Sequence, residues 1–212
     1  MTEILDPEQD EFSDVEFKKV EERETRIQAK LFNGCTFIKC NFNGAVFQNC
    51  RFRDCTFKGC DLSLANLKGC SFANTTFEDS LLIGIDWTLT SWGTGKFYFK
   101  QVDFSGCVLN YDSFMGLNLK KTIMRKCVAH EVGFQDCDLT QADLTLCDLK
   151  DSRFGHTNLT DADLRGAKDY QIDPTQNTLK KTRFSMPEVM ALLYSLDIEI
   201  AELSAEEPSP SL

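Results

Sequence analysis

Residues 35–77 read CTFIK CNFNG AVFQN CRFRD CTFKG CDLSL ANLKG CSFAN TTF. In each group of five, the first residue is small, the third is large and apolar, and the others are mostly polar. A period of five matches neither the 3.6-residue turn of an α-helix nor the two-residue alternation of a flat strand. The stretch is therefore an internal repeat, which predicts a fold of stacked, similar units.

The repeat predicts a coil with four sides. Two inward and three outward residues per block make one flat side followed by a corner, and four such sides bring the chain back over itself. Residues twenty positions apart should then stack, and Cys107, Cys127 and Cys147 recur at that interval. We predict an all-β fold, a four-sided parallel β-helix of about seven coils spaced about 4.8 Å apart, followed by a short C-terminal α-helix.

The inward positions predict the composition of the core. Ten cysteines occupy the small position of the blocks, and they lack the closely spaced pairs that zinc sites use. We interpret them as small buried hydrophobic residues, interchangeable with alanine, serine or threonine at the same position. The large residues predicted to fill the core of the first coils are Phe37, Phe42, Phe47, Phe52, Phe57, Leu62, Leu67 and Phe72.

The pattern divides the chain into four segments. Glu22 falls on an inward position that a packed core would reject, so the first residues form an arm or an incomplete coil. The last residues are acidic and contain two prolines, which predicts disorder. The predicted segments are an acidic arm or partial first coil at 1–26, the β-helix at 27–168, a C-terminal cap, helix and dimerisation element at 169–200, and a disordered tail at 201–212.

One interruption stands out inside the repeat. Trp87 and Phe99 both carry the large residue of a block, but they lie twelve residues apart where the repeat allows ten. We therefore predict a register slip at 88–98, with an insertion within 88–96. Two glycines there permit a tight excursion of the backbone. The residues that this excursion would present to a partner are Trp92, Gly93, Thr94 and Gly95.

After the repeat, the sequence predicts a helix. Ser185 is the expected N-cap, Pro187 lies in the first turn, and Glu188 completes a capping box. The apolar residues that follow could cap the last coil or form a two-fold homodimer interface. We favour both together, because a repeat end with apolar residues left over needs covering. The predicted interface residues are Met186, Val189, Met190, Leu192, Leu193, Leu196, Ile198 and Ile200.

The charge of the chain limits its partners. With 23 basic and 33 acidic residues, the formal net charge is −10. This balance argues against direct binding to nucleic acid or to an anionic membrane, since both need a basic surface. The acidic N-terminus has no apolar signal core, and no apolar run is long enough to span a bilayer. We predict a cytoplasmic protein.

The sequence offers no catalytic constellation. His130 and His156, the two histidines, fall on outward positions, and no phosphate-binding glycine motif occurs. Carboxylates on the outside of a convex rod have no pocket that would shift their pKa or exclude water. We therefore expect no enzyme activity, no catalytic residues, no cofactor and no metal site.

The repeat resembles the pentapeptide-repeat family, whose fold is a right-handed quadrilateral β-helix. Narrower similarity lies in Cys60-Asp61-Leu62-Ser63-Leu64, in Gly84-Ile85-Asp86-Trp87, and above all in Arg183-Phe184-Ser185-Met186-Pro187-Glu188 and Ser195-Leu196-Asp197-Ile198-Glu199. These segments look like the topoisomerase-protecting members, which include the albicidin-resistance, microcin B17 immunity and quinolone-resistance Qnr proteins.

The resemblance implies a function. It implies a dimeric rod that resembles duplex DNA, engages DNA gyrase or topoisomerase IV, and protects the enzyme from topoisomerase poisons. Loops that project from the rod carry protection in the Qnr relatives, and the interruption described above would be the comparable feature here. The alternative is a non-enzymatic interaction scaffold or regulator that binds another protein. The acidic face that would stand in for phosphates consists of Asp136, Asp138, Asp143, Asp148, Asp151, Asp161 and Asp163.

Overall fold

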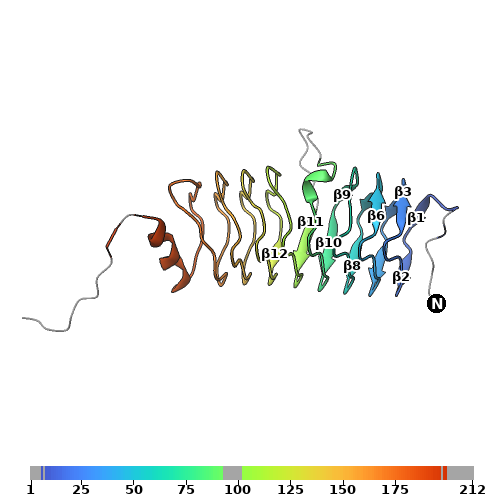
Figure 1. The fold of residues 1–212 in the computed structure, drawn as a ribbon, viewed down its shortest axis with the longest axis horizontal. Helices are drawn as coiled ribbons and strands as arrows, with labels where there is room; N and C mark the ends of the chain where they lie inside the picture. The colour runs from blue at the N-terminus through green and yellow to red at the C-terminus, as the bar shows by residue number, and fades with distance from the viewer. Residues whose placement is uncertain (1–5, 7, 93–101, 197, 200–212) are drawn as a thin grey trace, which may run out of the picture.

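The chain winds into a rod of stacked coils. The computed structural model describes residue 6 and residues 8–92, 102–196 and 198–199. The first coils lie at one end of the rod and the C-terminal helix at the other (Figure 1). Successive coils pair in parallel, so that one block of five residues makes one side of a coil. This is the right-handed quadrilateral parallel β-helix expected from the sequence.

Four faces run along the rod. Face 1 is the sheet β1–β4–β7–β9, and face 2 is the sheet β2–β5–β8–β10–β11–β12. Face 3 is held by single parallel bridges that run from Glu21 to Lys168, and face 4 begins with β3 and β6. The strands are β1 (Glu11–Ser13), β2 (Glu16–Lys18), β3 (Arg26–Gln28), β4 (Leu31–Asn33), β5 (Thr36–Ile38), β6 (Val46–Gln48), β7 (Arg51–Arg53), β8 (Thr56–Lys58), β9 (Ser71–Ala73), β10 (Thr75–Glu78), β11 (Val102–Ser105) and β12 (Met124–Arg125).

The core is a set of parallel stacks of large side chains. The rings of Phe37 and Phe57 stack with centroids 4.4 Å apart, and those of Phe32 and Phe52 with centroids 4.9 Å apart. Neighbouring stacks meet edge to face, as Phe32 and Phe37 do at 70°. The eight large residues predicted for the core all lie in it, and none is more than 7% exposed. Such dense packing makes each ring costly to remove.

The small inward residues do more than fill space. All ten cysteines are free and buried. The Cys60 thiol donates a hydrogen bond to the Phe37 carbonyl at 3.3 Å, and the Thr157 hydroxyl donates to the Phe134 carbonyl at 2.7 Å. The cysteines are small and buried, as interpreted from the sequence, and the structure adds a hydrogen-bonding role that the interpretation did not include. Many of these positions hold a small donor that gives a carbonyl of the preceding coil an additional hydrogen bond.

The insertion is longer than the sequence pattern indicated. Phe57 pairs with Phe77, 20 residues later, but Phe77 pairs with Phe104, 27 residues later. The coil therefore contains seven extra residues, not two. In a repeat of five residues, an insertion is visible only as a shift in register. Insertions of two and of seven residues both shift the register by two positions, so the sequence does not distinguish them. Because the Ser91 amide still donates to the Cys70 carbonyl, the insertion lies between Ser91 and Val102.

Of the two alternatives predicted for residues 1–26, an arm or a partial first coil, the structure has a coil from Glu11 onward. Strand β1 pairs with β4, β2 pairs with β5, and Glu21 forms a bridge with Asn41. The first coil is therefore formed from Glu11 onward. Glu22 is tolerated on its inward position because this coil is open to solvent on one side, where the side chain stays half-buried.

The coils also continue beyond residue 168. Arg153 forms a bridge with Gln171, 18 residues later, whereas Asn158 forms a bridge with Thr178, 20 residues later. A shortened side of the coil is thus compensated by a longer turn at 173–176. Tyr170 and Ile172 are only 2% exposed and join the core. The pentapeptide pattern breaks there although the coil does not.

Two short helices interrupt or end the coils: η1 (Trp87–Leu89) and η2 (Glu188–Ser195). Helix η2 is the predicted C-terminal helix, but it has 3₁₀ rather than α geometry, and its N-cap is Pro187 rather than Ser185. The Ser185 hydroxyl instead accepts a hydrogen bond from the Gly166 amide of the preceding coil at 2.9 Å. The predicted capping box is therefore not formed, because its serine is already used.

Candidate partner-binding surfaces

The seven predicted acidic residues do not share one face. Asp138 lies on face 1, Asp143 and Asp163 on face 2, and Asp148 on face 3, each on an outward position. The other three occupy left-handed corners between faces, with φ of 57° to 59°: Asp136, Asp151 and Asp161. The C-terminal coils therefore carry carboxylates around the rod rather than along one side.

The four outward aspartates stabilise the coil itself. Each accepts a hydrogen bond from the backbone amide two residues later, as Asp143 does from Thr145 at 3.1 Å. Each is also paired with a base. Asp138 pairs with Lys120 at 2.9 Å, and Asp143 pairs with Arg125. These carboxylates are thus partly neutralised by the rod, which limits what they offer to a basic partner.

The same pairs keep these groups ionised. The Arg165 side chain holds the pKa of the Asp163 carboxyl below its usual range, with a further contribution from Arg183. Burial works to raise the pKa of Asp148, but hydrogen bonds from Lys168 and His130 outweigh it, so the pKa lies below its usual range. The pKa values of Asp138 and Asp143 are lowered in the same way. All four groups carry negative charge at neutral pH.

The corner acids are the more available charges. Asp151 is exposed and Asp161 half-buried, and within the described residues neither makes an ion pair. Asp136 is exposed, with a carboxylate oxygen 3.7 Å from Nδ1 of His156. Glu131 and Asp169, also exposed at left-handed corners, add to this set. A partner that approaches the rod therefore meets the corner acids first.

The predicted loop contacts lie at the insertion. Trp92 is half-buried and packs against the core, with its Nε1 donating to the Trp87 carbonyl at 2.9 Å. Its indole therefore anchors the base of the insertion. Gly93, Thr94 and Gly95 lie outside the described residues, as does Phe99.

A buried carboxyl supports the coil that precedes the insertion. Asp112 is 2% exposed and accepts hydrogen bonds from the Ile85 amide at 2.7 Å and from Trp87 Nε1 at 3.0 Å. Burial raises the pKa of Asp112 well above its usual value, against the opposing effect of these hydrogen bonds. In the sequence, Asp112 is only an unusual residue at a small inward position. The repeat pattern does not show which main-chain or side-chain groups of the neighbouring coil its carboxyl contacts.

The C-terminal end presents a second surface. The predicted interface residues Met186, Met190 and Ile198 are 70%, 39% and 55% exposed, and Tyr194, which the prediction missed, is 84% exposed. These four residues recur every four positions, and that spacing could have identified Tyr194. The remaining described members of the predicted set are half-buried, and Leu192 packs against the core: Val189, Leu192, Leu193 and Leu196. Ile200 lies outside the described residues.

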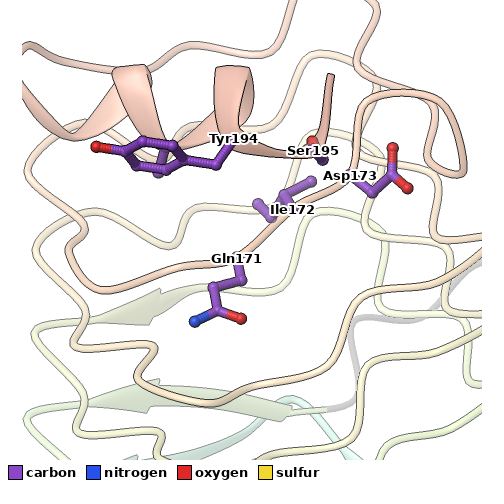
Figure 2. Close-up of a pocket in the computed structure, with 6 residues that line it drawn as sticks. Gln171, Ile172, Asp173, Tyr194 and Ser195 are labelled. Carbon is purple, nitrogen blue, oxygen red and sulfur yellow. The ribbon is translucent and has the colours of Figure 1, made fainter. Parts of the chain in front are cut away.

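An open cavity of about 460 Å³ lies between helix η2 and the last coil. Figure 2 shows Tyr194 and Ser195 on the helix side, with Gln171, Ile172 and Asp173 on the coil side. Tyr170 lies buried nearby in the chain, and its hydroxyl has no hydrogen-bond partner among the described residues. Burial, together with the neighbouring charge of Glu188, raises the pKa of Tyr170 to about 12. The helix therefore covers the last coil only in part.

The part of the chain that the structure describes has neither a metal-binding cluster nor a membrane-spanning helix. Across the described ranges, His, Cys, Asp and Glu side chains form no group of three that could hold a metal ion. In the same part of the chain, the helices are too short and too polar to span a bilayer.

Comparison with known proteins identifies the repeat. A family model described as a pentapeptide repeat region matches residues 30–98, and one described as pentapeptide repeats (8 copies) matches residues 130–166. A comparison with curated protein sequences finds no significant match.

Among solved structures, the chain is similar to a trypsin-treated variant of QnrB1, a plasmid-mediated fluoroquinolone resistance protein. The TM-score is 0.62 at 17% identity, covering 88% of this chain and 100% of that one. Full-length QnrB1 gives a TM-score of 0.50 at 19% identity, covering 89% and 100%. HetL of the cyanobacterium Nostoc, involved in heterocyst differentiation regulation, gives 0.44 at 17% identity, covering 85% and 93%. The two family-model matches together span half of the chain, and the chain belongs to the pentapeptide-repeat proteins.

Proposed function

We propose that this cytoplasmic protein binds DNA gyrase or topoisomerase IV as a mimic of duplex DNA and protects the enzyme from topoisomerase poisons. The observation that carries the proposal is the distribution of carboxylates around a narrow rod, on three of its faces and at the corners between them. A basic DNA-binding surface attracts such an array by the electrostatics with which it attracts phosphates. The likeness to QnrB1 in fold supports the choice of this partner class.

The protein would act as a homodimer. The exposed residues Met186, Met190, Tyr194 and Ile198 at the C-terminal end resemble the apolar centre of a self-complementary interface. Two rods joined there would place their acidic coils near the centre of one longer rod. This arrangement would present the greatest density of negative charge where the two protomers meet.

The test is a supercoiling assay with purified gyrase, relaxed plasmid and a fluoroquinolone, albicidin or another poison, with and without the protein. The expected result is restored supercoiling at about equimolar protein. A variant with Asp136→Asn, Asp151→Asn and Asp161→Asn should lose rescue while keeping its fold, because asparagine tolerates the left-handed corners. Absence of rescue with every poison class, together with no binding to gyrase or topoisomerase IV, would refute the proposal.

The ion pairs favour a second candidate, a non-enzymatic scaffold or regulator for another protein. Arg125, Arg165 and Arg183 neutralise face 2, where a phosphate mimic would keep its charges free. A scaffold of this kind should retain its partner when the three corner acids are replaced. The same triple variant therefore separates the two functions.

A further inference from the structure

One corner of the rod has a composition unlike its neighbours. The corner between faces 3 and 4 stacks one residue per coil, because each amide donates to a carbonyl of the next coil, as Leu64 does to Ile83 and Tyr111 does to His130. In order along the rod, this corner reads Glu24, Gly44, Leu64, Gly84, Tyr111, Glu131 and Asp151. It is acidic at both ends and apolar in the middle.

The two large apolar residues of this corner contribute little to the stability of the fold. Leu64 and Tyr111 are 65% and 60% exposed, and both adopt left-handed backbone conformations, with φ of 60° and 66°. Bulky side chains rarely take this conformation, and exposure gives little burial in return. Gly84 lies between them in the stack, and a Cβ there would come 3.0 Å from Leu64 Cδ2. The corner therefore has two apolar projections, and the Leu64 side chain leans over the backbone of Gly84 between them.

Face 3, next to this corner, shows the same pattern of acidic residues at both ends and apolar residues in the middle. Parallel bridges connect Asp61, Leu81, Val108, Val128 and Asp148 in that order. The three central residues face outward on positions that hold aspartate in the coils before and after them, and Leu81 is 41% exposed. Two adjacent columns thus form one apolar surface with carboxylates at both ends.

We propose that this surface, the Leu64–Tyr111 ridge, is a docking site for a protein segment with apolar side chains in its centre and lysine or arginine at both ends. An apolar side chain of the partner would contact both Leu64 and Tyr111. Basic residues would meet Glu131 about 5 Å beyond Tyr111, and Glu24 about 10 Å beyond Leu64, given the spacing between coils. Apolar contact supplies the affinity, and the terminal charges set the orientation.

The ridge is independent of the proposed protection of gyrase or topoisomerase IV. It lies mainly in the first six coils and uses none of the acids that the triple variant replaces, apart from the neighbouring Asp151. A protein that failed to protect gyrase would still bind such a segment, and a protein that protected gyrase could lack this site.

The experiment is a fluorescence anisotropy titration of the full chain with a labelled synthetic peptide that has leucine and phenylalanine in its centre and lysine at both ends. The variants Leu64→Asn and Tyr111→Asn should each weaken binding about tenfold, because each removes half of the apolar contact. Gly84→Asn should also weaken binding, because its Cβ would come 3.0 Å from Leu64 Cδ2 and displace that side chain. Asparagine suits the left-handed corner, so these variants should keep their fold, as circular dichroism would show.

Matched controls lie elsewhere on the rod. Leu146→Asn removes an exposed leucine from another left-handed corner, and Gly116→Asn adds a side chain where nothing lies within 4 Å. Both should bind the peptide as the unaltered protein does. Glu24→Gln with Glu131→Gln should weaken binding and reduce its salt dependence. The proposal is overturned if the peptide does not bind, or if the ridge variants bind as tightly as the controls.

Discussion

At the scale of single residues, the rod is stabilised by hydrogen bonds between small inward side chains and the main chain of the neighbouring coil. Ser152 shows both directions of this contact. Its hydroxyl donates to the Ala129 carbonyl at 2.5 Å and accepts from the Val132 amide at 3.0 Å. The position therefore needs a small side chain with a hydrogen-bonding atom, and size alone does not satisfy it.

We predict that Ser152→Ala lowers the free energy of unfolding by about 1–3 kcal/mol, because two buried main-chain groups lose their partner. Ser152→Cys should lose less, since a thiol still donates weakly and cysteines serve the same purpose elsewhere in this rod. Urea denaturation of the three proteins measures the difference. Equal stability of the alanine variant and the unaltered protein would contradict this account of the small position.

The buried carboxyl of Asp112 predicts a pH dependence. Its pKa is raised in the folded state, so the unfolded chain releases the proton at lower pH than the folded chain. The stability that Asp112 provides is present below its unfolded pKa of about 4 and is lost as pH rises toward the folded pKa.

Asp112→Asn gives a neutral side chain that cannot accept from both Ile85 and Trp87. We expect this variant to be less stable than the unaltered protein at acidic pH and to approach it as the pH rises. Urea denaturation at pH 5 and pH 8 provides the comparison. A stability difference that stays constant with pH would show that Asp112 is not protonated in the folded protein.

At the scale of elements, the insertion is an addition to a coil that is otherwise regular. The coil keeps its pairing up to Ser91 and regains it at Val102. Removing residues 94–100 leaves three residues between Ser91 and Val102, as there are between Ser71 and Thr75 one coil earlier. We expect the shortened protein to fold with equal or greater stability, because a shorter loop loses less entropy on closure. Loss of cooperative thermal unfolding would show that the insertion is needed for the fold.

Helix η2 is the element that we expect to join two protomers. Tyr194→Asp places a charge among the exposed apolar residues Met186, Met190 and Ile198. It should convert a dimer into a monomer of 24.1 kDa. Sedimentation equilibrium measures the mass directly. Leu64→Asp, at an exposed corner near the other end of the rod, should leave the dimer intact. A monomeric unaltered protein would rule out this interface.

At the scale of the whole molecule, the period of five determined most of what could be predicted. It placed Phe37 and the other large residues in the core and gave the four-sided parallel β-helix. It could not give the length of the insertion, because insertions that differ by five residues produce the same shift in register. It missed the coil side around Tyr170, where a two-residue shortening breaks the pattern without breaking the main-chain pairing.

The candidate surfaces were less predictable for a related reason. Sequence spacing identifies which residues point outward, but the pairing of Asp143 with Arg125, and of Asp163 with Arg165 and Arg183, depends on contacts between coils and within one turn. The acidic residues were therefore recognised as a group before their separate roles were visible. The outward aspartates stabilise turns, whereas the corner acids are the charges that the proposed partner would meet.

The most direct test of DNA mimicry is competition for gyrase between this protein and a labelled DNA duplex, followed by fluorescence anisotropy. A mimic should displace the duplex at rising concentrations, with an apparent affinity that falls as salt increases. The variant with Asp136→Asn, Asp151→Asn and Asp161→Asn should compete poorly. Formation of a complex that contains gyrase, the duplex and this protein together, or no displacement at any concentration, would contradict the account.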